Sequence, residues 1–106
     1  MYAHIVEFVP KLEKRKEFIW LFNNKLLPML KKQDGFLDAQ LLFQINSEKA
    51  LATSLWAERT HAELYERERF PKVQEIMEPY LSNRITVKHF VVESAVRDCF
   101  GKASAA

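Results

Sequence analysis

Few residues of this chain can exchange a proton near neutral pH, and the three histidines, His4, His61 and His89, are the main candidates. Histidine is the usual general base in proteins. His4 lies in an apolar segment, two residues from Tyr2 and from Val6. In an extended chain these side chains share one face. His4 would there be either the base that deprotonates a phenolic or enolic substrate or a core histidine bonded to a neighbour.

A second set of candidates lies in the middle of the chain. His61 and Tyr65 are four residues apart, which on a helix places an imidazole and a phenol on one face. They would lie at the mouth of a pocket, or would be a solvated histidine beside a half-buried tyrosine. Trp56 could stack on a planar ligand or bond to it through its indole N–H, or it could serve packing alone.

Motifs for metals and cofactors are not found in the sequence. His4, His61, His89 and Cys99 do not show the spacing of a metal site, so none is expected. The chain has no glycine-rich phosphate loop, no G-x-S-x-G elbow and no C-x-x-C pair. We therefore expect no nucleotide cofactor, no serine hydrolysis and no dithiol chemistry.

The elements that must position these side chains follow from the hydrophobic pattern. Short segments rich in β-branched and aromatic residues predict strands, and apolar residues spaced by three and four predict helices. Pro28 lacks the amide that would bond to Asn24, so a kink or break is expected there. In chain order the prediction is a strand over 2–9, a helix over 12–33, strands over 36–45 and 50–56, helices over 60–69 and 71–81, a strand over 85–96 and a flexible tail over 97–106.

This order predicts an α+β fold, the split βαβ or ferredoxin-like sandwich, with a four-stranded antiparallel sheet and both helical layers on one face. Residues 1–96 would form that single domain. Tyr2, His4, Val6 and Phe8 are expected to face the helices. The other face is not cleanly polar either, so it needs a cover, and the simplest cover is a second copy of the chain. On that face we expect an apolar patch that consists of Ile5, Val9, Val87 and Val91. We also expect His89 to lie at the dimer interface.

Composition limits the class of protein. The chain has 106 residues, 48% hydrophobic and 28% charged, with a formal net charge of +2, which favours one globular domain over a disordered chain or a nucleic-acid binder. Its apolar runs are far shorter than a membrane span. With a single cysteine and no apolar leader, the sequence favours a reducing cytoplasm.

Three segments together resemble the antibiotic biosynthesis monooxygenase (ABM) domain of the dimeric α+β barrel superfamily. They are the strand–helix start, the turn Gln33-Asp34-Gly35-Phe36-Leu37, and Ser54-Leu55-Trp56 followed by a helix that contains Tyr65. The resemblance spans about residues 2–96. It implies a homodimer with facing sheets and a ligand pocket between the helices and the sheet of each protomer.

The resemblance also separates the branches of that family. The haem-degrading branch has an amide, a tryptophan and a histidine at places that are Phe8, Tyr65 and Glu75 here, so haem degradation is not expected. The phenol-oxidising branch is matched by Trp56, but the amide four residues before it is Ala52.

Three functions are compatible with the sequence. The first is a cofactor-independent monooxygenase of a small aromatic or quinol-type substrate, with His4 as base and Trp56 and Tyr65 as orienting groups. Its pocket walls would include Phe8, Phe22 and Phe90. The second is a non-catalytic dimer that binds a small ligand or responds to stress, and the third is an isomerase of a small carbonyl compound.

Overall fold

A computed structural model describes residues 1–95 of the chain. The tail predicted over 97–106, including Cys99, and the end of the predicted domain at residue 96 lie outside the described residues. Within residues 1–95 the strands and helices follow the predicted order. They are β1 (Tyr2–Phe8), α1 (Arg15–Leu21), α2 (Leu27–Lys31), β2 (Phe36–Phe43), β3 (Ala50–Trp56), α3 (Arg59–Glu68), α4 (Phe70–Met77) and β4 (Thr86–Val91).

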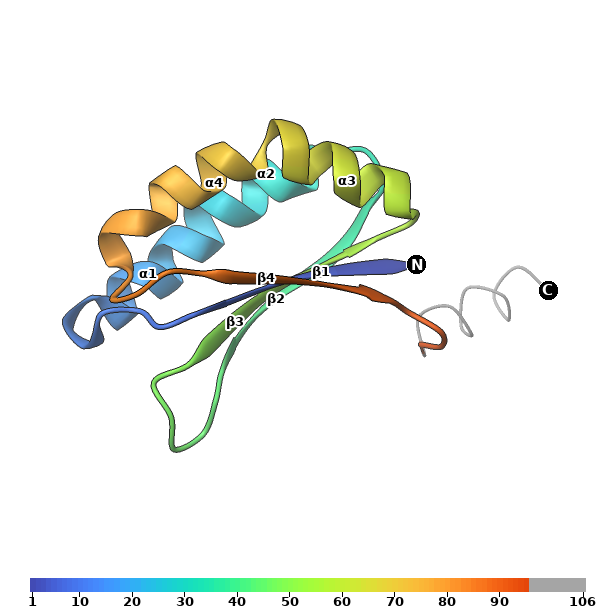
Figure 1. Ribbon diagram of the computed structural model, residues 1–106. Coiled ribbons are helices and arrows are strands. Elements are labelled where there is room, and N and C mark those ends of the chain that lie inside the picture. The colour runs from blue at the N-terminus through green and yellow to red at the C-terminus, as the bar shows by residue number, and fades with distance from the viewer. Residues whose placement is uncertain (96–106) are drawn as a thin grey trace.

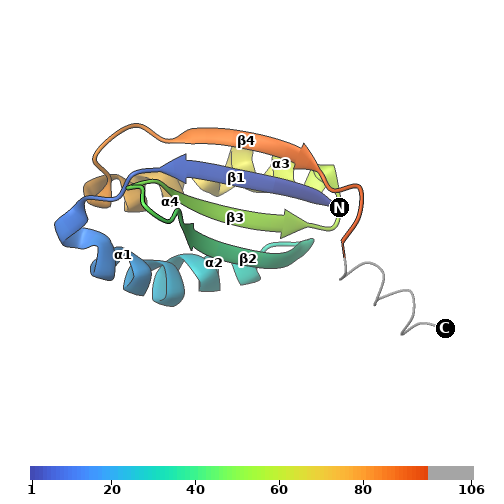
Figure 2. The same ribbon diagram turned by 90° about the horizontal axis from the view of Figure 1, so that it is seen from below.

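The four strands form one antiparallel sheet in the order β2-β3-β1-β4. Figure 1 shows the helices of residues 1–95 on one face of this sheet, and the view from below in Figure 2 shows that none of these residues covers the other face. The α+β, ferredoxin-like fold predicted from the order of elements is therefore confirmed.

The core lies between this sheet and the helices, and β1 runs through its centre. Side chains of β1 alternate strictly, with Tyr2, His4, Val6 and Phe8 buried toward the helices. The predicted orientation of His4 is thus confirmed. Helix residues complete the core: Phe18, Leu21, Phe22, Leu26, Leu30, Tyr65, Phe70, Val73 and Met77.

The first helical region is interrupted, as predicted, but by a wide turn that precedes Pro28. Residues Phe22–Leu26 form a π-helical turn, and the N–H of Leu27 donates to the carbonyl oxygen of Phe22, five residues back. Pro28 then lies in the first turn of α2, where its missing N–H leaves no regular helical bond unmade. A short 3₁₀ turn, Leu12–Lys14, precedes α1, and another, Glu78–Tyr80, follows α4.

Strand β2 is shorter than predicted and contains a bulge. Phe36 pairs with Trp56, whereas Asp38 pairs with Leu55, so Leu37 is an extra residue between two regular pairs. In a regular strand over 36–45, the alternation would place Leu37 and Ile45 on the same side as Ala39, Leu41 and Phe43, but the structure does not show this. The bulge takes Leu37 out of the alternation, and Ile45 lies beyond the strand with 85% of its surface exposed.

At the other edge of the sheet, the side chains of strand β4 point to the opposite faces from those predicted. It ends at Val91, and His89 lies directly opposite His4, as Val87 lies opposite Val6. Directly opposed residues in antiparallel strands point to the same face. His89, Val87 and Val91 therefore face the helices, and their predicted place in a dimer interface is wrong.

The open face nevertheless carries apolar side chains. Ile5 pairs with Thr53 on one side and Lys88 on the other, and Leu42 and Phe90 are large exposed hydrophobic residues. Lys88 forms an ion pair with Glu7 across this face at 3.2 Å. Among residues 1–95, no helix is both long and apolar enough to cross a bilayer.

Candidate functional site

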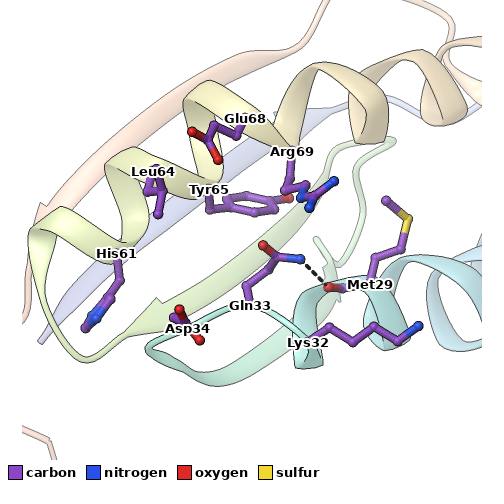
Figure 3. Close-up of a pocket in the computed structure, with 9 residues that line it drawn as sticks. All are labelled: Met29, Lys32, Gln33, Asp34, His61, Leu64, Tyr65, Glu68 and Arg69. Atoms are coloured by element: carbon purple, nitrogen blue, oxygen red, sulfur yellow. Dashed lines mark hydrogen bonds between the residues drawn. The ribbon is translucent and has the colours of Figure 1, made fainter.

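A groove lies between the C-terminal end of α2 and the side of α3 (Figure 3). Its volume of about 470 Å³ is within the usual range of about 300–1,000 Å³ for small-molecule sites. Met29, Lys32 and Gln33 come from α2 and the turn after it, while His61, Leu64, Tyr65 and Arg69 come from the α3 side. Two of the three residues predicted as catalytic, His61 and Tyr65, are therefore brought together here.

The turn at Gly35 fixes one end of this groove. Gly35 has φ +78°, a left-handed backbone conformation that residues other than glycine rarely adopt. A Cβ at this position would lie 2.2 Å from Cγ and Nδ1 of His61, so the imidazole packs directly on the glycine backbone. The carbonyl oxygen of Gly35 accepts a hydrogen bond of 2.8 Å from the N–H of Ala57. The turn at Gly35 thus contacts both the residue that follows β3 and the first turn of α3.

His61 and Gln33 differ in their side-chain hydrogen bonds. Nδ1 of His61 is buried and has no hydrogen-bond partner among the described residues. The side-chain amide of Gln33 donates to the carbonyl oxygen of Met29 at 3.0 Å, which fixes Gln33 at the end of α2, in the wall opposite α3.

Tyr65 forms the inner wall of the groove and is buried by Trp56. The two rings stack with centroids 4.9 Å apart and an interplanar angle of 28°. Burial, and secondarily the charge of Glu66, raises the pKa of Tyr65 well above its ordinary value. The phenol is therefore a hydrogen-bond donor at any physiological pH.

Trp56 has no exposed surface. Its indole N–H donates to Oγ of Ser54 at 2.9 Å, and Phe36 packs against it with ring centroids 5.8 Å apart. The predicted substrate-binding residue Trp56 is thus packed in the core behind Tyr65, where it acts on the groove only through that tyrosine.

His4 lies deeper than the groove. Only 2% of its surface is exposed, and its ring has Phe70 and Tyr65 around it at centroid distances of 4.9 Å and 5.7 Å. Together with Phe22 it lines a small cavity of about 30 Å³. This cavity can hold a water molecule but not an aromatic ring. Burial lowers the pKa of His4 against the opposing charge of Glu66.

The two remaining predicted pocket walls lie elsewhere. Phe8 packs on Phe18 in the core, with ring centroids 4.9 Å apart, and does not line the groove. Phe90 is 49% exposed on the open face of the sheet, because its direct partner Ala3 points away from the helices. Phe90 therefore cannot line a cavity between the helices and the sheet of its own chain.

The structure also brings together three residues that the sequence analysis did not combine. Glu66 of α3 reaches over the sheet, with Oε2 2.9 Å from Nε2 of His89 and Oε1 3.4 Å from Nε2 of His4. The ligand-type atoms of all three residues lie within 4.8 Å of one another. The sequence contains no local signal for this cluster, since its members come from β1, α3 and β4.

The fold is shared with known proteins of low sequence identity. A monooxygenase from the gene ActVA-Orf6 of Streptomyces coelicolor, solved with nanaomycin D, matches with a TM-score of 0.73 at 13% identity over 90% of this chain and 89% of its own. SnoaB, a cofactor-independent oxygenase from Streptomyces nogalater, matches with a TM-score of 0.73 at 13% identity over 90% and 95%. Rv0793 from Mycobacterium tuberculosis matches with a TM-score of 0.70 at 14% identity over 90% and 97%.

No protein-family model matches the sequence, and no curated protein sequence does. The structural matches confirm the fold that the resemblance to the ABM family implies.

Proposed function

We propose that the protein is an ABM-type monooxygenase that acts without a cofactor on a small aromatic or quinol-type substrate bound in the groove between α2 and α3. The observation that carries the proposal is the groove itself, which combines an imidazole, a protonated phenol and a size suited to a small ligand. Two of the proteins that share the fold are described as oxygenases, one of them cofactor-independent.

In the proposed reaction His61 takes a proton from the substrate, and Tyr65 donates a hydrogen bond to the resulting oxyanion. Lys32 and Arg69 line the same groove and add positive charge near that anion, beside the carboxylates of Asp34 and Glu68. The electron-rich anion then reduces dioxygen directly. One oxygen atom replaces two hydrogens of a ring methylene as a carbonyl, and the other leaves as water.

The role of base passes from His4 to His61 in this proposal. His4 does not line the groove, and the cavity that it does line is too small for the substrate. His61 lines the groove, and because its Nδ1 is buried against Gly35, Nε2 would be the atom that takes the proton.

Oxygen uptake by the purified protein with a panel of quinols, anthrones and naphthols tests the proposal. General-base catalysis contributes about 10²–10⁴-fold, so His61→Gln is expected to lower turnover at least tenfold. Tyr65→Phe should lower it as well, whereas Tyr80→Phe, a tyrosine that does not line the groove, should not. Substrate conversion in an anaerobic control would indicate an isomerase, and saturable binding without turnover would indicate a non-catalytic binding protein. Either result would refute the oxygenase.

We further propose that the open face of the sheet pairs with the same face of a second copy. Its apolar side chains, Ile5, Leu42 and Phe90 among them, support this, because monomers rarely leave such a patch in water. Light scattering after size-exclusion chromatography should give the mass of a dimer. Ile5→Asp should convert it to a monomer, since an unpaired carboxylate would be buried. The matched change Ile45→Asp, at a site 85% exposed, should leave the dimer intact.

A further inference from the structure

The cluster of His4, Glu66 and His89 is built by the tertiary fold. His4 and His89 are direct partners across β1 and β4, so both rings leave the sheet on its helix-facing side. Their centroids are 5.4 Å apart, and Glu66 of α3 lies above them with one carboxylate oxygen toward each ring. Two imidazoles and a carboxylate therefore converge on one point from three separate elements.

We propose that these three residues bind a divalent first-row transition metal ion. Ligand atoms about 2.0–2.2 Å from one ion lie about 3.0–3.5 Å from each other. Oε2 of Glu66 lies 2.9 Å from Nε2 of His89, and Oε1 lies 3.4 Å from Nε2 of His4. One ligand atom from each of the three residues lies within 4.8 Å of the other two. Side-chain rotation must close the widest separation, which is at most 4.8 Å, for all three atoms to reach one ion.

A second observation, independent of these distances, points the same way. Nε2 of His4 is fully buried and has no hydrogen-bond partner among residues 1–95, although it is aimed at Glu66. Its 3.4 Å approach to Glu66 lacks the geometry of a hydrogen bond, whereas the 2.9 Å contact of His89 has it. Hydrogen bonds among the described residues thus leave Nε2 of His4 without a partner, which is rare for a buried polar atom. A metal ion would use the lone pairs of all three residues at once.

The ligand set defines the class of ion. Imidazole nitrogen suits zinc, copper, iron and nickel, whereas magnesium and calcium prefer oxygen ligands throughout. Two histidines and one carboxylate occupy one side of an ion and leave its other positions open to water or a small ligand.

An ion could reach the cluster from solvent. The side chains of Glu66 and His89 are 33% and 38% exposed, whereas His4 closes the inner end at 2%. None of the three lines the groove between α2 and α3. The metal site therefore goes beyond the proposed oxygenase function, and either proposal can fail without the other.

The experiment measures metal binding in the absence of any substrate, on full-length protein without a histidine tag. Protein stripped with a chelator is titrated with Zn²⁺ and with Co²⁺ by calorimetry, and Co²⁺ binding is also followed by its visible absorption. We expect one ion per chain, a higher melting temperature with Zn²⁺ and no response to Mg²⁺. Loss of an outer partner of a metal ligand already costs about 10–100-fold in affinity, so Glu66→Gln and His89→Gln should each lower it by at least about 100-fold.

The controls match residue type and element. Glu63→Gln changes an exposed glutamate of the same helix, and His61→Gln changes a histidine outside the cluster. Both should bind the ion as the unchanged chain does. The two rim variants are preferred to changes of the buried His4, and circular dichroism checks their fold. Absence of stoichiometric binding, or unchanged binding in both rim variants, would overturn the proposal.

Discussion

Replacing Gly35 by alanine tests whether the turn before β2 and the first turn of α3 are packed as closely as described. Two costs are expected. An alanine at φ +78° loses about 1–2 kcal/mol, the cost of a left-handed conformation for an L-residue. Its Cβ would also lie 2.2 Å from Cγ and Nδ1 of His61, and overpacking of this kind costs about 1–3 kcal/mol. The free energy of unfolding should therefore fall by about 2–5 kcal/mol.

A double-mutant cycle separates the two costs. His61→Ala removes Cγ and Nδ1, the two atoms at 2.2 Å, and leaves the Cβ contact of 2.6 Å. Gly35→Ala should therefore cost less in the His61→Ala background than in the unchanged chain, with a difference of about 1–2 kcal/mol. Urea denaturation of the four proteins, followed by circular dichroism, gives the four free energies. Equal costs in both backgrounds would show that His61 does not pack on Gly35, and would remove the fixed end of the groove.

Other consequences of the structure can be checked with single variants. Ser54→Ala removes the acceptor of the buried Trp56 indole N–H, and leaving that donor unpaired should lower the free energy of unfolding by about 1–3 kcal/mol in urea denaturation. Glu63→Ala breaks the exposed pair with Arg59 and should leave the denaturation midpoint nearly unchanged, as surface ion pairs contribute little. Val73→Ala empties part of the core under α4 and should be clearly destabilising in the same assay, by about 1–3 kcal/mol.

The order of elements and the buried face of β1 could be predicted from the sequence because they depend on local spacing. The alternation from Tyr2 to Phe8, the interruption before Pro28 and the division of the second helical region near residue 70 need no knowledge of partners. The orientation of β4 could not be predicted in this way. Both of its faces contain apolar residues, and the pairing of His89 with His4 decides which face turns to the helices.

In the candidate site, too, local spacing predicted some residues, whereas others depend on contacts between distant segments. His61 and Tyr65 were predicted because four residues separate them on one helix. The cluster with Glu66 could not be predicted, since His4 and His89 are 85 residues apart in the chain and meet only through the register of β1 and β4. Phe90 was misplaced for the same reason, because aromatic character alone does not tell which face of an edge strand a residue occupies.

The wide turn Phe22–Leu26 has a consequence for how this chain should be aligned with relatives. A π-turn holds one residue more than an α-helical turn over the same path. Each residue of an α-helix advances the side chains by about 100° around its axis. A relative with an unbroken helix would therefore place its core residues in step with Phe18 or with Leu30, but not with both. A one-residue gap opened within 22–26 restores the correspondence on either side. Alignments that forbid a gap inside a helix would compare buried positions with exposed ones over half of this region, which would make true relatives look more distant.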